Sequence, residues 1–218
     1  MIADAYTPHS GDTRYHVIHY DLSLDYRVTT NRLTGTAVLH IRLKKRAKHI
    51  SLDLVGMKAT RVTVSGERRT SFQQDERRVR LTFEDRKDEG AELMVTVEYS
   101  GAPGPRRTRW GLIGWEELED GVLVASQPNG SGTWFPCNDH PADTSTYRLE
   151  FTADPAYTVV SGGPATKSTQ RGRTRWTFTQ DTPTAAYLMT VQIGRLTDDT
   201  VALGAHTGRL YYPRPLAA

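Results

Sequence analysis

Residues 20–28 read Tyr-Asp-Leu-Ser-Leu-Asp-Tyr-Arg-Val, and this stretch sets the expected fold. Apolar and polar residues alternate along it, and in an extended chain successive side chains point to opposite faces. One face of such a strand therefore meets a core while the other meets water. The same alternation returns at residues 39–43, 93–99, 147–151, 176–178 and 187–193.

Turn residues separate these extended stretches, and no long segment carries apolar residues at helical spacing. We therefore predict an all-β fold, a large β-sandwich or saddle-like double sheet, mostly antiparallel and with little helix. No linker divides the chain, so residues 15–218 are expected to form a single domain behind a flexible N-terminal tail at residues 1–14. Turn signals stand at Ser65-Gly66, Glu89-Gly90, Asp120-Gly121 and residues 161–164.

The composition of the 218-residue chain is that of a folded protein, with 37% hydrophobic and 24% charged residues and a net charge of +3. Nothing in the sequence resembles a secretory signal or a membrane-spanning run of about 18 apolar residues. The single cysteine requires no oxidising compartment, so we expect a cytoplasmic protein without a membrane partner. Arginine pairs at Arg68-Arg69, Arg77-Arg78 and Arg106-Arg107 are interpreted as solvated surface, and no nucleic-acid partner is expected.

Motifs for catalysis are absent from the sequence. There is no H-E-x-x-H, no G-x-S-x-G, no phosphate-binding glycine loop and no C-x-x-C. His16 and His19 are the one suggestive histidine pair, but an odd spacing in a strand sends them to opposite faces unless a bulge intervenes. No catalytic residue and no metal ligand is therefore predicted in this chain.

Residues 126–143 form a long polar segment between two predicted strands, and long connections in compact β domains are often functional. Asp139, His140 and Asp143 could support acid–base chemistry or a metal. The favoured interpretation is structural, since aspartates in turns bond to nearby backbone amides. Cys137 has no neighbouring lysine or arginine to activate it, and is predicted to be a packed thiol rather than a nucleophile.

This segment resembles one in the membrane alanyl aminopeptidase-like zinc peptidases, a gluzincin family. In that family a strand containing glutamine precedes a Phe-Pro-Cys-x-Asp-x-Pro run, which residues 135–141 match. The resemblance implies that Pro136, Cys137, Asp139 and Pro141 shape a structural loop. Weaker similarities to the family follow in order at residues 20–24, 33–37, 50–53, 97–101 and 182–188.

The resemblance implies that the chain is the N-terminal, non-catalytic β domain of a zinc metallo-aminopeptidase, a hydrolase that removes N-terminal residues from peptides. In the family this domain packs against a thermolysin-like catalytic domain that carries H-E-x-x-H and zinc. Neither that domain nor its motifs are in this chain, so we expect it to be cut near the junction and inactive alone. It should hold no cofactor itself, while zinc is expected in the full-length enzyme.

The resemblance also implies a substrate-binding role for Gln127 and Asn129. In the family a glutamine, and a glutamine or glutamate two residues later, line the pocket for the N-terminal residue of the peptide. Gln127 matches the first position. Asn129 falls at the second and departs from the pattern, because its side chain is one methylene shorter.

Two other function classes remain open at this point. The chain could be a stand-alone β-sandwich module that binds a protein or peptide without enzymatic activity. A severed domain should expose an apolar patch where its partner docked, whereas a natural module should be mostly polar and have a finished C-terminus. The sequence at residues 213–218 looks unfinished, which favours the severed domain. A carbohydrate-binding sandwich would use Trp110, Trp115 and Trp134, although tryptophans in β domains are more often core residues.

Overall fold

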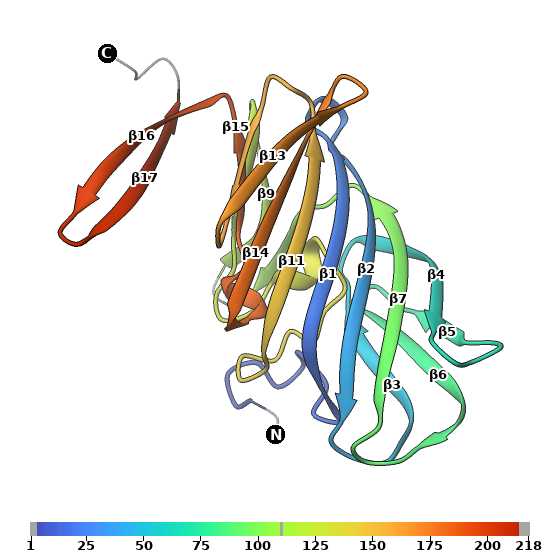
Figure 1. The fold of residues 1–218 in the computed structure, drawn as a ribbon. Helices are drawn as coiled ribbons and strands as arrows, with labels where there is room; N and C mark the ends of the chain where they lie inside the picture. Colours follow the sequence, from blue (N-terminus) through green and yellow to red (C-terminus); the bar gives the residue numbers. More distant parts are fainter. Residues whose placement is uncertain (1–3, 110, 214–218) are drawn as a thin grey trace.

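The largest sheet has seven strands, with the alternating stretch at its centre (Figure 1). The computed structural model describes residues 4–109 and 111–213. All strand pairs within this part of the chain are antiparallel except one, as the sequence predicts. In spatial order the strands are β13 (Ala165–Gln170), β14 (Arg173–Ala185), β11 (Thr144–Ala153), β1 (Tyr15–Arg27), β2 (Arg32–Leu43), β7 (Glu92–Gly101) and β4 (Met57–Val64).

Strand β1 has the alternation that the sequence predicts. Tyr20, Leu22, Leu24 and Tyr26 are buried, while the residues between them are half-buried or exposed. The strand pairs antiparallel with β2 and parallel with β11. A parallel neighbour must arrive through a long connection, and strands β2 to β10 lie between β1 and β11 along the chain.

Three smaller sheets complete the fold. A three-stranded sheet lies beside the lower part of β2 and β7, and a five-stranded sheet lies behind the large sheet (Figure 1). A two-stranded hairpin stands apart from the others. The three-stranded sheet consists of β3 (Ala47–Asp53), β6 (Arg78–Lys87) and β5 (Ser71–Gln74). The five-stranded sheet consists of β12 (Thr158–Ser161), β15 (Val191–Gly194), β10 (Gly121–Ala125), β9 (Gly111–Leu118) and β8 (Pro105–Thr108). The hairpin consists of β16 (Leu196–Leu203) and β17 (His206–Pro213).

Helical structure is confined to single 3-10 turns in the described part of the chain. They are η1 (Val28–Thr30), η2 (Ser131–Thr133) and η3 (Ala186–Leu188). Among residues 4–109 and 111–213, no helix is long and apolar enough to cross a bilayer.

Aromatic side chains join the large sheet to the five-stranded sheet. Tyr26 of β1 meets Trp115 of β9 edge-on, with ring centroids 4.9 Å apart. Trp115 lies 6.5 Å from Trp134, whose ring meets Phe135 at 4.5 Å. Trp115 and Trp134 are completely buried, so neither offers a platform to a sugar. Trp110, the third tryptophan of the carbohydrate-binding hypothesis, lies outside the described residues.

Strand β1 contains a bulge, the feature that would let His16 and His19 share a face despite their odd spacing. The register against β2 shifts between Val17 and His19, so His16 and His19 both lie among the half-exposed positions of the strand. The expectation that they point to opposite faces is therefore wrong. Each ring nevertheless has its own partner, since His16 Nδ1 lies 2.6 Å from Asp143 Oδ1 and His19 Nδ1 lies 2.7 Å from Thr146 Oγ1.

The expectation of a loose tail does not hold for residues 7–12. Asp12 is buried, and its carboxylate accepts a bond from the Ser51 amide at 2.9 Å. The Gly11 amide donates to Asp53 at 2.7 Å. Gly11 has a φ of +72°, and a Cβ there would lie 2.4 Å from His140 Cβ. The segment packs this closely because a glycine permits both the left-handed backbone and the approach.

Candidate functional site

The segment at residues 126–143 enters the interior at Asn129 and stays buried as far as His140. Trp134, Phe135 and Cys137 are completely buried. The backbone of Cys137 pairs with the end of β3, where the Asp53 amide donates to Cys137 O at 2.7 Å and the Cys137 amide donates to Asp53 O at 3.0 Å. We call residues 126–143 the core loop, because its backbone is fixed by the strands that it crosses.

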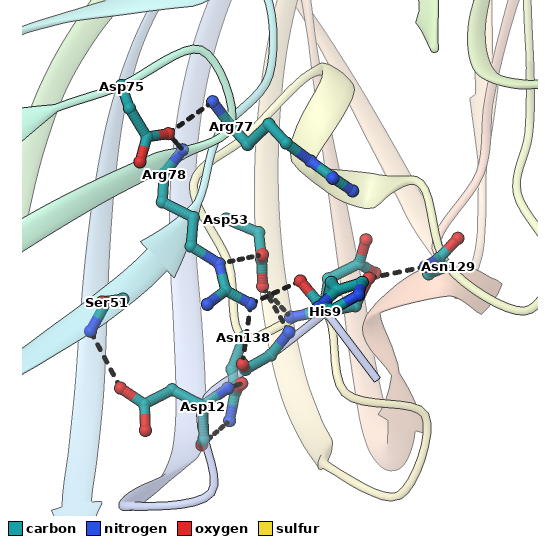
Figure 2. Close-up of polar contacts among 12 residues, drawn as sticks. His9, Asp12, Ser51, Asp53, Asp75, Arg77, Arg78, Asn129 and Asn138 are labelled. Atoms are coloured by element: carbon teal, nitrogen blue, oxygen red, sulfur yellow. Dashed lines mark hydrogen bonds and ion pairs between the residues drawn. The ribbon is translucent and has the colours of Figure 1, made fainter. Parts of the chain in front are cut away.

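Two buried carboxylates hold the core loop against the N-terminal segment. Asp53 Oδ2 accepts bonds from the amides of Gly11 and Asp139, at 2.7 and 3.1 Å. Figure 2 shows Arg78 reaching from β6 toward Asp53, with Nε 3.2 Å from Oδ1. Asp139 Oδ2 accepts from the Gly130 amide at 2.7 Å and closes the start of η2. The aspartates thus act as acceptors for backbone amides, in line with the structural interpretation of Asp139.

Burial and the neighbouring Asp53 raise the pKa of Asp139 to about 7. Burial also raises the pKa of Asp53, against the lowering effect of Arg78. A carboxyl whose folded-state pKa exceeds its unfolded value stabilises the fold fully at acid pH. That contribution is lost as the pH rises toward the folded-state pKa, because the unfolded chain has already released its proton.

The exchange Asp139→Asn is expected to remove part of this pH dependence. Relative to the variant, the wild-type free energy of unfolding should fall between about pH 4 and 7, by at most about 1.4 kcal/mol per pH unit, and then level off. Asparagine keeps an oxygen for the Gly130 amide but does not titrate. Urea unfolding at several pH values measures both proteins. Parallel curves would mean that Asp139 is ionised across this range.

Asn138 connects more parts of the site than any residue that the sequence singled out. The backbone amide of Asn138 donates to Tyr20 Oη at 3.0 Å. Its side-chain Oδ1 accepts from the Asp12 backbone amide at 2.7 Å, and its side-chain Nδ2 donates to Asp143 Oδ2 at 2.8 Å. All three contacts are buried. Sequence reasoning missed this role because an asparagine in a polar loop resembles a turn residue; its place within the matched motif was the only signal.

Asp143 and His140 are held in structural contacts rather than arranged as an acid–base pair. Asp143 bonds to His16 and accepts from the Val17 amide at 3.2 Å. His140 Nδ1 accepts from the Ala142 amide at 3.1 Å. The Asp143 bonds tie the end of the core loop to β1, and the His140 bond closes a turn within the loop.

The thiol of Cys137 is unsuited to nucleophilic chemistry. Burial raises its pKa well above the usual range, and the charges of Asp139 and Asp53 act in the same direction. A thiolate is the reactive species, so this thiol stays protonated and inert at neutral pH. Pro136 is buried beside it, whereas Pro141 is half-buried at a pocket.

No group of three or more His, Cys, Asp or Glu side chains among residues 4–109 and 111–213 is arranged to hold a metal ion. The candidate ligands His16 and His19 have separate partners in Asp143 and Thr146. Zinc therefore does not fit the residues that the structure describes, and we derive no chemistry through it here.

The structure separates Gln127 from Asn129. Gln127 is exposed and lines a pocket of about 420 Å³ with Asp4, Tyr6, Pro128 and Pro141. Asn129 is only 3% exposed, and its Nδ2 donates to Ser10 Oγ at 2.6 Å. The two side chains therefore do not line one pocket. We call the pocket at Gln127 the amide pocket.

The family model of the peptidase M1 N-terminal domain matches residues 16–188. The match covers most of the chain, and the chain belongs to this family. The expected family and fold class are therefore confirmed.

Curated relatives are much longer than this chain. Glutamyl aminopeptidase of Mus musculus is 26% identical over 202 residues, which cover 83% of this chain and 21% of the relative. Tricorn protease-interacting factor F2 of Thermoplasma acidophilum is 27% identical over 180 residues, which cover 81% of this chain and 22% of the relative. The chain thus spans about a fifth of the length of these proteins.

Solved structures of M1 zinc metallopeptidases also match nearly the whole of this chain. The M1 zinc metallopeptidase of Deinococcus radiodurans has a TM-score of 0.86 and 26% identity, over 98% of this chain and 51% of that chain. A mutant of the Deinococcus radiodurans enzyme bound to a Tyr-Ser-Ala substrate has a TM-score of 0.87 and 26% identity over the same shares. The family implies zinc in the complete enzyme, and this chain corresponds to about half of each solved chain.

Proposed function

We propose that this chain is the non-catalytic half of a zinc aminopeptidase and that it receives the N-terminal residue of a peptide in the amide pocket. The observation that carries the proposal is the exposed Gln127 side chain, which lines the amide pocket two residues before the core loop becomes buried at Asn129. A rigid support of this kind holds a binding group in place before the ligand arrives. Hydrolysis would be carried out by residues outside this chain.

The chemistry of the amide pocket suits a positively charged amino group. The Asp4 carboxylate lies at the pocket, and bonds from the Thr7 and Tyr6 amides lower its pKa. It is therefore ionised at neutral pH. An ammonium group has donors and no acceptors, so the Asp4 carboxylate and the Gln127 carbonyl oxygen can both accept from it. This supports a free peptide N-terminus as the occupant.

An apolar groove supports the proposal that a second domain docks on the chain. The groove has a volume of about 620 Å³ and lies between the five-stranded sheet and the β16–β17 hairpin. Leu118 and Leu123 line it and are 47% and 37% exposed. Large exposed apolar patches mark interaction sites. The solved relatives contain a further half beyond the matched region, and we propose that this half covers the groove.

Gln127→Ala in the longest protein that contains this chain is expected to raise KM for aminoacyl-arylamides by at least about tenfold, with kcat little changed. The loss corresponds to one hydrogen bond to a charged group. Gln170→Ala, which changes an exposed glutamine on the edge strand β13, is the matched control. Equal kinetics in the Gln127 variant and wild type would exclude Gln127 from substrate binding.

Replacing Leu118 and Leu123 together by glutamine tests the docking surface. In the 218-residue chain alone, the free energy of unfolding should change by less than about 0.5 kcal/mol, because both side chains are partly exposed there. In the longer protein the same change should cost about 2–3 kcal/mol, since it removes two buried apolar side chains. Urea unfolding of both forms gives the comparison. Equal small effects in both would favour a stand-alone binding module.

A further inference from the structure

A second pocket, of about 260 Å³, shares Tyr6 with the amide pocket and has the opposite charge. It lies between the N-terminal segment and β8. Its lining contains four arginines and no carboxylate. We call it the arginine pocket. Its lining includes Ser10, Arg77, Arg106, Arg107, Arg109 and Asn129.

Two of the four arginine side chains lack a partner of opposite charge in the part of the chain that the structure describes. Within residues 4–109 and 111–213, the side chains of Arg77 and Arg107 form no ion pair or hydrogen bond. Arg106 Nη2 lies 3.4 Å from Ser10 Oγ, and its Nε is buried without a partner. Arg109 is fixed by Tyr6, whose carbonyl oxygen lies 3.0 Å from Nη2. Like charges around one cavity repel unless something of opposite sign lies between them.

Asn129 gives a second, independent indication of a ligand. Its side chain is buried at the pocket wall, where Nδ2 donates to Ser10 while Oδ1 has no partner. The Ser10 hydroxyl can also donate, so a rotated amide would satisfy Oδ1 and leave Nδ2 available instead. Either way one polar atom of the amide is unpartnered. Buried polar groups rarely lack a partner, and a bound polar group would supply one.

We propose that the arginine pocket binds an oxyanion, the carboxylate or phosphate group of a small ligand. The planar guanidinium group bonds such oxygens in pairs, and the Arg106 Nε–H is an unused donor. The volume lies below the roughly 300–1,000 Å³ of sites for drug-sized molecules, which suits a single small anionic group. The proposal does not depend on the amide pocket or on peptidase activity.

The test is a calorimetric titration of the chain with two probes, inorganic phosphate and N-acetyl-Glu-Glu. The acetylated peptide has no free amine and cannot bind through the proposed chemistry of the amide pocket. Binding of this peptide would therefore support the arginine pocket even if Gln127 proved to have no role in substrate binding. Binding should weaken as sodium chloride is raised, because salt screens exposed charges. Binding of one probe alone identifies the source of the oxyanion and supports the proposal.

Arg106→Gln is expected to weaken binding by at least about tenfold, the loss of one charge-assisted hydrogen bond. The double variant Arg77→Gln with Arg107→Gln removes two exposed charges and should weaken binding without affecting the fold. Arg68→Gln removes an exposed arginine from a turn outside the pocket and should change affinity less than twofold. Binding of neither probe, or equal losses in the Arg68 and pocket variants, would overturn the proposal.

Discussion

Trp134→Ala is expected to lower the free energy of unfolding of the chain by about 3–5 kcal/mol, the range for a buried aromatic side chain replaced by alanine. The indole is completely buried and packs on Phe135 and Trp115. The main-chain carbonyl oxygen of Trp134 accepts from Tyr99 Oη at 3.0 Å, a bond that the alanine variant can keep. A cavity at this point lies between two sheets and the core loop, where no neighbouring side chain is free to fill it.

Trp176→Ala is the matched control for this measurement. Trp176 lies on β14, is only half-buried and stacks on Phe178 at the outer part of the sheet. Its loss should cost about 1–2 kcal/mol, less than that of Trp134, since Trp176 is only partly buried and its ring lies under the Lys167 side chain. Urea unfolding of both variants gives the comparison. A Trp134 variant no less stable than the Trp176 variant would mean that the core loop contributes little to the fold.

Asp53→Ala is expected to cost about 3 kcal/mol, because three groups lose their acceptor together. The amides of Gly11 and Asp139 and the Arg78 guanidinium all bond to this carboxylate. Leaving buried donors and a partly buried charge without a partner costs more than the bonds contributed when formed. The effect should be measurable by urea unfolding at neutral pH.

A second readout separates this role from ordinary loss of packing. The Asp53 charge helps to raise the pKa of Asp139, so that pKa should fall in the Asp53 variant. Titration of the Asp139 carboxyl carbon by NMR measures the change. Asp88→Ala is the control, because Asp88 is an exposed partner of Arg46 and should change stability by less than about 0.5 kcal/mol. An unchanged Asp139 pKa would contradict the coupling.

Together these variants test one arrangement. The core loop carries Gln127 at one end, while its middle is built into the hydrophobic core and its aspartates bond to backbone amides. A loop fixed in this way can present an amide side chain in one orientation. The same packing fixes the N-terminal segment, which supplies Asp4 and Tyr6 to the amide pocket.

The strand pattern could be predicted because alternation is a local property of the chain. Tyr20, Leu22, Leu24 and Tyr26 face the core as the sequence indicates, since successive residues of a strand point to opposite sides. The core-loop motif was also recognisable in the sequence, and with it the family. Burial of Cys137 follows from residue type, since cysteine is among the residues most often buried.

Long-range contacts were beyond the sequence. The bulge at Ile18 puts His16 and His19 on one face, although a regular strand would separate them. Gln127 and Asn129 were expected in one pocket, but the backbone turn between them sends Asn129 inward to Ser10. The N-terminal segment looked loose because its anchors, Asn138 and Asp53, lie far along the chain.

Alternation was thus sufficient for the all-β class and the strands, and the resemblance of the core-loop motif was sufficient for the family, because each depends on residues that are neighbours in the sequence. The tertiary structure alone decided which charges meet. Arg77 and Arg106 look like parts of separate solvated pairs in the sequence, yet folding brings them to one pocket beside Asn129. No local pattern encodes that meeting, since it follows from how β8, the N-terminal segment and the core loop pack together.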